Sequence, residues 1–394
     1  MTETSSSART AADGIELTVL MLCRNKAQTL ATCTDRAHRF LARAGVVGEV
    51  PIADNGSTDS SQQITLAHGA KVVEVPSRGY GGALIGGTEA ARGCCVIMGD
   101  AEDSCDFTRL DGLLECLRAG DDLVMGNRFR GGIAVGAMPA LHRYMGAPLL
   151  TGIGRIFFRS PLKEFRCGLH GYDREAMLDL ELKTTGMELA SEMVVKSTLA
   201  SLRVSEVPTT LARGGRSRLP HLRSRRDGWR HLRFLLVFSP RWLFLLPGLT
   251  ALGIVVIGSL LLIGPAQVGG IGLDVASQVC MAALAVIGYQ AILFAILTKL
   301  HAERGLPSAS QSEFRVVRRA RDARTLLAPG VALIVVGLAI LIVQIVVWGQ
   351  FGFGALDAQA MISVAIPASL SLILGAQTVM AGMFTGILTI PTRS

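Results

Sequence analysis

The sequence predicts an α/β domain built on a parallel sheet, followed by four helices that span a membrane. Two observations predict this division. Residues 15–126 alternate short apolar runs with helical stretches, which is typical of a parallel sheet covered by helices on both faces. Beyond residue 241, four long runs contain no Asp, Glu, Lys or Arg. Because a water-exposed helix needs a polar face, we interpret these runs as transmembrane rather than as a soluble helical core.

Five strands and four helices are expected in the α/β part. The strands are predicted at residues 15–23, 46–53, 71–75, 94–99 and 122–126, and the helices at residues 26–44, 60–68, 82–92 and 107–119. The first 14 residues are polar and are expected to be disordered, without a secretory signal. Sheets of this kind bind ligands at the carboxyl ends of their strands. The residues that follow each strand are therefore the first candidates for a site.

Acidic residues follow the fourth strand, where Asp100 and Glu102 stand two positions apart and Asp103 comes next. A spacing of two puts both side chains on the same side of an extended backbone, so they can converge on one ion. Paired carboxylates with open positions suit Mg²⁺ or Mn²⁺ that also holds a substrate diphosphate. The alternative is a solvated acidic turn.

Two other strand ends carry polar or glycine-rich residues. Gly79, Gly81 and Gly82 precede a helix and fit a backbone that passes close to a phosphate, or tight helix–sheet packing. Neither a P-loop nor a dinucleotide fingerprint is complete here. Asp54 follows the second strand and is able to accept hydrogen bonds from a base or ribose, or to serve a turn.

The membrane segments are predicted at residues 242–264, 275–298, 325–349 and 361–390. The loops at residues 265–274 and 350–360 have no Lys or Arg, whereas residues 301–324 carry six arginines and residues 213–241 carry nine. Because excess Arg marks the cytoplasmic side, we expect both the α/β domain and the C-terminal tail in the cytosol. A bacterial inner membrane is favoured over the endoplasmic reticulum.

The net charge of +8 does not indicate nucleic-acid binding. The arginine surplus lies beside the first membrane segment, where anionic lipid head groups attract it, and aromatic residues make up only 5% of the chain. The eight cysteines form no C-x-x-C pair, so we interpret them as small buried hydrophobes.

Taken together, these features resemble the GT-A fold of family 2 glycosyltransferases, in the branch of the dolichol-phosphate mannose or glucose synthases. The resemblance covers nearly all of residues 15–212, continues through the Arg-rich acceptor loop and juxtamembrane helix at residues 213–241, and extends into the membrane part. The matching segments are residues 22–25, 54–59, 79–84, 99–104, 126–129, 167–170, 187–192, 206–208, 215–218 and 227–230.

The resemblance implies a role for each matching residue. The donor nucleotide sugar would be bound by Asn25, Asp54, Asn55, Gly79, Gly81 and Asp100. The metal would be held by Asp100, Glu102 and Asp103. Arg128 would lie near the donor or acceptor phosphates and act in catalysis with Asp100 and Glu102. Arg216 and Arg218 would close over the acceptor phosphate.

Two sites in the second half of the domain allow two interpretations each. Glu188 and Glu192 lie one helical turn apart, so they either point together at the acceptor site, with Glu192 as a catalytic candidate, or form ion pairs such as one with Lys196. Residues 139–158 form an amphipathic stretch that lies across either the domain or the membrane surface. We interpret His142 within it as structural.

The implied reaction is an inverting transfer of a sugar from a UDP-glucose or GDP-mannose type donor to a polyprenyl phosphate. A phosphate monoester has a second pKa of about 6, so it is already mostly an anionic nucleophile at neutral pH. The enzyme must align that oxygen with the anomeric carbon and neutralise the departing nucleoside diphosphate. A homo-oligomer is compatible with the sequence, which does not specify the oligomeric state.

The sequence departs from the family pattern at several positions. Lys26 stands where the family has Glu, Asn55 and Glu102 each replace Asp, Glu164 replaces another Asp, and His170 replaces Arg. Lys26 reverses a charge at the nucleotide pocket, which is compatible with a different base or sugar. These departures leave open a catalytically degenerate membrane scaffold. A processive polysaccharide synthase is a second alternative, because such enzymes also join this fold to membrane helices. For the latter, Arg241-Trp242 is present but Phe238 holds the position of the expected Gln.

Overall fold

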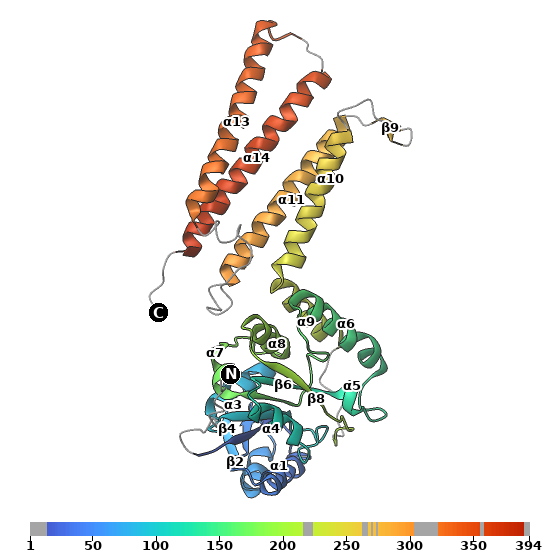
Figure 1. Ribbon diagram of the computed structural model, residues 1–394, viewed down its shortest axis with the longest axis vertical. Helices are drawn as coiled ribbons and strands as arrows, with labels where there is room; N and C mark the ends of the chain where they lie inside the picture. Colours follow the sequence, from blue (N-terminus) through green and yellow to red (C-terminus); the bar gives the residue numbers. More distant parts are fainter. Residues whose placement is uncertain are drawn as a thin grey trace, which may run out of the picture. The chain divides into compact units, whose positions relative to one another are not determined.

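The computed structural model describes residues 14–215, 224–261, 267–268, 271–272, 275–302, 322–354 and 358–389. The chain divides into two compact units, Met1–Leu235 and Leu236–Ser394. Figure 1 colours the first from blue to yellow-green and the second from yellow to red. Arg216 and Arg218, the predicted acceptor-phosphate residues, lie outside the described residues, as do the first 13 of the 14 residues predicted to be disordered.

The first unit is built on one mixed sheet of eight strands. They are β1 (Leu17–Cys23), β2 (Gly48–Glu49), β3 (Pro51–Asp54), β4 (Lys71–Glu74), β5 (Cys95–Asp100), β6 (Leu123–Asn127), β7 (His170–Asp173) and β8 (Val204–Pro208). Their order is β4-β3-β1-β5-β7-β6-β8, with β2 paired to β1. The five predicted strands are all present, and the second divides into β2 and β3.

The five predicted strands run in the same direction, as expected, but the sheet also contains an antiparallel strand that was not predicted. β7 runs antiparallel to both β5 and β6, while the other pairs of this sheet are parallel. Its sequence, His-Gly-Tyr-Asp, is completely buried yet carries few apolar residues, so hydrophobic patterning does not reveal it. Strand β7 separates β5 from β6 and thereby widens the carboxyl edge of the sheet.

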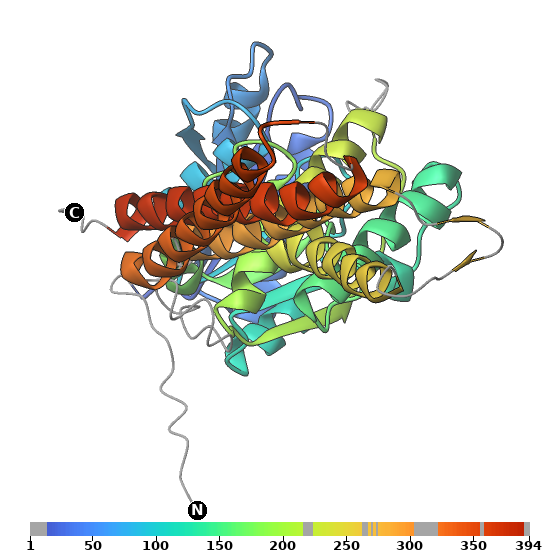
Figure 2. The same ribbon diagram turned by 90° about the horizontal axis from the view of Figure 1, so that it is seen from above.

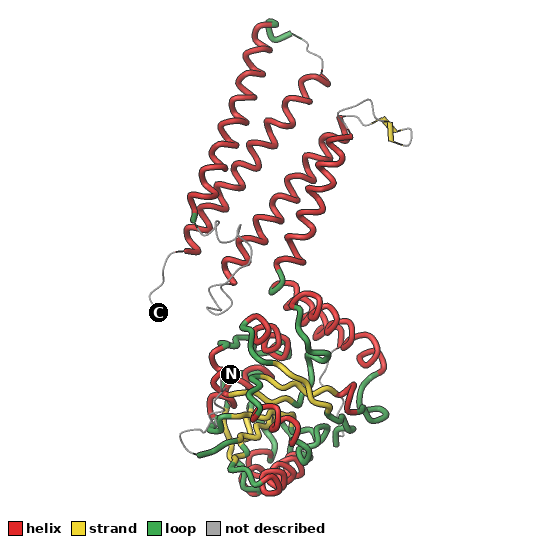
Figure 3. Tube along the Cα trace, in the orientation of Figure 1, coloured by secondary structure: helices red, strands yellow, loops and turns green. Residues whose placement is uncertain are grey.

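Helices cover both faces of this sheet, as predicted. They are α1 (Leu30–Ala44), α2 (Ser61–Ala67), α3 (Tyr80–Ala90), α4 (Asp111–Arg118), α5 (Arg128–Gly131), α6 (Ala147–Phe158), α7 (Arg174–Asp179), α8 (Leu189–Leu199) and α9 (Ser224–Val237). Two neighbouring residues of β7, which face opposite sides of the sheet, show which helix covers each face. A Cβ on Gly171 would lie 2.9 Å from Leu117 of α4, whereas the hydroxyl of Tyr172 lies 2.7 Å from that of Thr88 in α3. Figure 3 shows the strands between these helices.

Two π-helical turns interrupt the helices, and each stands two residues before a proline. They are η1 (His142–Gly146) before Pro148 and η2 (Arg241–Leu245) before Pro247. Proline has no N–H to bond to the carbonyl four residues earlier, and its ring crowds that carbonyl. The wider turn accommodates this, because the N–H of Ala147 donates to the carbonyl of His142, five residues back.

The second unit contains α10 (Leu246–Leu261), α11 (Val275–Ala302), α13 (Ala323–Gln350), α14 (Ala358–Thr389) and a small hairpin of β9 (Gln267–Val268) and β10 (Ile271–Gly272). Within the described residues, four helices are long and apolar enough to cross a membrane, at residues 241–260, 276–301, 323–350 and 361–388. They lie at the four predicted segments.

Close backbone packing and buried polar contacts hold this second unit together. Helices α13 and α14 lie side by side (Figure 2) and meet at Gly330 and Gly375, where an added Cβ on either would fall within about 3 Å of the other's carbonyl oxygen. The hydroxyls of Tyr289 and Thr378 lie 2.6 Å apart and tie α11 to α14. Small residues and hydrogen bonds replace the hydrophobic effect, which does not drive helix association in lipid.

Candidate active site

The carboxyl ends of β3, β1 and β5 lie level at one edge of the sheet. Cys23 of β1 pairs with Asp54 of β3, and Leu22 pairs with Asp100 of β5. The register therefore places Asp54 and Asp100 on either side of the end of β1, from which Asn25 and Lys26 follow. Sequence patterning predicted this gathering of polar residues at one edge, and the sheet order brings them together.

Lys26 and Glu102 form an ion pair at this edge. The Lys26 side chain is 10% exposed and that of Glu102 is 25% exposed. The ion pair is therefore mostly buried, but part of the Glu102 side chain remains accessible to solvent. Asn25 adopts a left-handed backbone (φ 56°), and a turn at residues 26–29 follows before α1 begins. This turn shortens the predicted helix at 26–44 and directs Lys26 toward Glu102. The charge that reverses the family pattern is thus balanced within the chain.

Asn55 fastens the glycine-rich segment to the end of β3. Its amide nitrogen donates to the carbonyls of Val75 and Ser77, at 3.2 and 2.6 Å, and its amide oxygen accepts from the N–H of Gly79 at 2.7 Å. Asp54 accepts hydrogen bonds from Ser57, and from Gln62 at 2.8 Å. Asp54 and Asn55, two of the predicted donor-binding residues, thus stabilise the loops at this edge of the sheet. Asn55 in particular positions the loop that precedes α3.

Gly79 and Gly81 pack directly against another backbone segment. A Cβ on Gly79 would lie 2.2 Å from the carbonyl oxygen of Thr185, and one on Gly81 would lie 2.2 Å from that of Thr184. The N–H of Gly81 donates to the Thr185 carbonyl at 2.9 Å. The expected helix–sheet packing is not what these two glycines serve, because residues 184–185 belong to no helix or strand, and donor binding by Gly79 and Gly81 stays a prediction.

Arg78, which sequence reasoning did not single out, lies exposed beside this loop. Its guanidinium donates to the carbonyl of Asn55 at 2.6 Å. Arg78 follows β4, which is the third predicted strand, at the same edge of the sheet as Asp54. Its position in the segment after a predicted strand could therefore have identified it as a candidate from the sequence.

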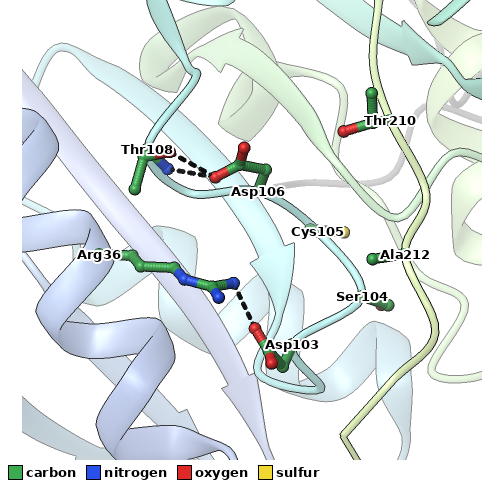
Figure 4. Close-up of a pocket in the computed structure, with 8 residues that line it drawn as sticks. All are labelled: Arg36, Asp103, Ser104, Cys105, Asp106, Thr108, Thr210 and Ala212. Atoms are coloured by element: carbon green, nitrogen blue, oxygen red, sulfur yellow. Dashed lines mark hydrogen bonds and ion pairs between the residues drawn. The ribbon is translucent and has the colours of Figure 1, made fainter. Parts of the chain in front are cut away.

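The three carboxylates predicted to hold a metal do not gather around one point. Glu102 pairs with Lys26. Asp103 pairs instead with Arg36 of α1, and Figure 4 shows this second pair. No group of three His, Cys, Asp or Glu side chains suited to a metal occurs among the described residues. Asp103 turns away because its backbone is left-handed (φ 60°). The structure thus pairs Asp103 with Arg36, and its role as a third metal ligand stays a prediction.

Asp100 and Glu102 still fit a divalent cation that is bound together with a substrate. Mg²⁺ and similar ions are commonly held by one or two carboxylates, with phosphate oxygens and waters completing the coordination. Space beside Asp100 depends on Gly168, because a Cβ there would lie 2.9 Å from an Asp100 carboxylate oxygen. Two carboxylates and a small neighbour suit a cation that arrives with a diphosphate.

The segment that leads toward residues 216–218 runs along the acidic turn. The N–H of Ala212 donates to the carbonyl of Ser104 at 3.0 Å, and the N–H of Gly215 donates to that of Glu102 at 3.2 Å. Between this segment and α1 lies a cavity of about 350 Å³ (Figure 4). It is lined by Arg36, Asp103, Ser104, Cys105, Asp106, Thr108, Thr210 and Ala212.

Arg128 is held by a buried carboxylate. It forms an ion pair with Glu164, whose side chain is 1% exposed, and its backbone N–H donates to the same carboxylate at 2.7 Å. A terminal guanidinium nitrogen also donates to the Arg166 carbonyl at 2.9 Å. Glu164, the acid that precedes Cys167, thus orients Arg128 at the end of β6.

His170 lies in the core rather than in a phosphate site. It is fully buried, and Nδ1 lies 3.2 Å from the Cys167 carbonyl oxygen. Burial lowers its pKa to about 4, so the ring is neutral at physiological pH. His142 contacts Arg166 at 3.3 Å, and burial together with the positive charge of Arg166 lowers its pKa too. Both therefore serve as neutral structural groups.

Glu192 forms the ion pair that was one of its two predicted interpretations. Its carboxylate lies 2.9 Å from the Lys196 ammonium, both side chains being buried, and it accepts from the hydroxyl and the N–H of Thr184 at 2.6 and 2.9 Å. Burial raises its pKa, but these hydrogen bonds outweigh that effect and lower it overall. Glu192 thereby fixes the segment that packs against Gly79 and Gly81.

The mixed α/β sheet with its acidic strand-end edge, joined to four apolar helices, agrees with the class that the family comparisons show, a membrane glycosyltransferase with a GT-A-like fold. The chain belongs to glycosyltransferase family 2. It matches the family "Glycosyl transferase family 2" over residues 18–180 and the "Glycosyltransferase family 2 C-terminal transmembrane region" over residues 296–389. It is a family 2 membrane hexosyltransferase by this relationship.

Two relatives come from Haloferax volcanii. The chain is 33% identical to the low-salt glycan biosynthesis hexosyltransferase Agl6 over 94% of this chain and 89% of the relative. It is 26% identical to a dolichyl-phosphate hexose transferase over 49% of this chain and 81% of that protein. Among solved structures, glucosyl-3-phosphoglycerate synthase from Mycobacterium tuberculosis is 20% identical with a TM-score of 0.42, covering 57% of this chain and 79% of the other. That likeness is too weak to support a conclusion about this chain.

Proposed function

We propose that this chain transfers a hexose from a nucleoside-diphosphate sugar to a polyprenyl phosphate at the cytosolic face of the membrane. The observation that carries the proposal is the strand-end edge, where Asp54, Asp100 and the Lys26–Glu102 pair come together. The relationship to a dolichyl-phosphate hexose transferase supports a lipid phosphate as the acceptor. A UDP-glucose or GDP-mannose type donor fits this class of reaction.

The donor would bind with its diphosphate toward Asp100 and Glu102. A bound Mg²⁺ or Mn²⁺ would supply positive charge that stabilises the departing nucleoside diphosphate. Lys26 lies at the same place and would offset the negative charge of Glu102 beside the diphosphate. Asn55 keeps the glycine-rich loop in place beside the nucleotide. Asp54 and Asn25 shape the pocket for the base and ribose.

The acceptor phosphate needs orientation more than activation. A phosphate monoester is already largely dianionic at neutral pH, since its second pKa is about 6, and no tuned general base is required. Arg128, oriented by Glu164, would hold this phosphate, because a guanidinium matches phosphate oxygens in geometry. Arg216 and Arg218 would close over it. In-line attack then inverts the anomeric centre.

The lipid tail of such an acceptor requires a membrane beside the catalytic unit. The four apolar helices provide the anchor, and the arginines at residues 213–241 and 301–324 favour a cytosolic catalytic unit. A soluble donor and a membrane-bound acceptor would then meet at the level of the lipid head groups.

The test uses purified protein in lipid nanodiscs with undecaprenyl phosphate, Mn²⁺ and radiolabelled UDP-glucose or GDP-mannose. We expect an organic-soluble, lipid-linked sugar from one donor, and none from Asp100→Asn. Radioactive polymer in place of the lipid product would support the processive synthase. Failure of every nucleoside diphosphate to bind with Mn²⁺ would support the scaffold and overturn the proposal.

A further inference from the structure

The helix formed by η1 and α6 carries large apolar side chains on its outer face. Five of them, spaced three, one, four and seven residues apart, are 59% to 72% exposed in the structure. They are Leu141, which immediately precedes η1, and Tyr144, Met145, Leu149 and Ile156. A surface helix in water normally turns such residues toward the core and polar residues outward. An exposed apolar face of this size marks an interaction surface.

The inner face of the same helix is made of small residues. Ala147, Thr151 and Gly154 are buried, and a Cβ on Gly154 would fall 2.4 Å from the ring of Phe165. The helix therefore sits tightly on the domain with its small side inward. It has no room to rotate and bury Leu149 or Ile156 instead, so the outer face needs a partner outside the domain.

The charge around this helix favours an anionic partner. Residues 123–163 contain no Asp or Glu. Arg143, Arg155 and Arg159 flank the apolar face, and none of them forms an ion pair with the residues that the structure describes. An apolar face edged by arginines is the pattern of helices that lie in a membrane surface. A second copy of this chain would present the same positive charge and be repelled.

We infer that the outer face of η1–α6 lies in the head-group region of an anionic lipid bilayer. The chain carries four helices that are long and apolar enough to cross a membrane, so a bilayer is a partner that the protein itself supplies. This contact is separate from the proposed transfer reaction, because it concerns how the catalytic unit is oriented on the bilayer surface. It also connects to the site, since His142 of η1 contacts Arg166, whose carbonyl binds Arg128. A seated helix would hold Arg128 near the head groups.

Site-specific photo-crosslinking in the full-length protein tests this inference. p-Benzoylphenylalanine is placed at Leu149, in nanodiscs of phosphatidylcholine with phosphatidylglycerol, and lipid adducts are measured by mass spectrometry. Leu66 of α2, which is 66% exposed in the same unit, is the matched control. We expect about tenfold more lipid adduct at Leu149 than at Leu66, because only the former would reach the acyl boundary. Both positions are exposed, so neither label disturbs the core.

The lipid charge is tested separately. Omitting phosphatidylglycerol, or combining Arg155→Glu with Arg159→Glu, should reduce the adduct at Leu149 several-fold. Equal yields at Leu149 and Leu66 would overturn the inference, and so would adducts that join two protein copies. No donor or acceptor is present in this experiment, so its outcome is independent of whether the proposed reaction occurs.

Discussion

Lys26 and Glu102 stand 76 residues apart in the sequence and form an ion pair at the carboxyl edge of the sheet. One follows β1 and the other follows β5, and the adjacency of these two strands brings them together. The pair joins a lysine that departs from the family pattern to one of the two carboxylates suited to a cation. Charge at the donor site is therefore set by both residues.

Removing the lysine should strengthen metal binding in the absence of nucleotide. Lys26 competes with a divalent cation for Glu102, so Lys26→Met should raise Mn²⁺ affinity by about tenfold, as expected for the loss of a nearby like charge. Electron paramagnetic resonance of free Mn²⁺ measures this directly. Arg36→Met, which releases Asp103 in the same way, is the control and should change nothing. An increase with Arg36→Met would show that Asp103 is a ligand.

Gly168→Ala should impair the same site through Asp100. The new Cβ would lie 2.9 Å from the Asp100 carboxylate, which must then turn away. We expect at least about a tenfold loss of metal-dependent nucleotide binding, because a ligand is misplaced, with an unchanged melting temperature. Calorimetric titration with UDP or GDP and Mn²⁺ measures the binding. Gly152→Ala, with open space around it, should bind normally, and equal binding by both variants would contradict the assignment.

Arg128→Met should lower the stability of the catalytic unit, and this loss would obscure any effect on binding of the acceptor phosphate. It leaves the buried Glu164 carboxylate without its partner, which typically costs about 3–5 kcal/mol. The double variant Arg128→Met with Glu164→Leu should recover most of the stability and still fail to use the acceptor. Thermal unfolding and lipid-product formation are measured together. Recovered transfer in the double variant would remove Arg128 from phosphate binding.

Stability should depend on pH through His170. Its pKa is about 4 in the fold and near 6.5 in the unfolded chain, so the unfolded state binds more protons between these values. Stability is therefore complete above pH 6.5 and falls as the pH drops toward 4, by about 3 kcal/mol for this group. His170→Leu should flatten that part of the curve in thermal unfolding from pH 7 to 4. An unchanged slope would contradict this.

Much of the site could be predicted because it follows from local patterns. Apolar runs that end in polar residues located Asp54 and Asp100 at strand ends, and the spacing of four residues allowed the Glu192–Lys196 pair. The direction of a side chain could not be predicted where the backbone dihedral angles lie outside the α and β regions that most residues adopt. Asn25 and Asp103 both have positive φ, and those two turns direct Lys26 to Glu102 and Asp103 to Arg36.

The sequence by itself determined the two-part organisation of this protein and the edge at which its site lies. Length, charge-free composition and strand–helix alternation are properties of contiguous residues, so they can be read without coordinates. Only the tertiary structure decided that β7 is antiparallel, that His170 is a core residue and that Lys26 neutralises Glu102. These depend on contacts between distant segments, which the packing of the whole sheet selects and no local pattern encodes.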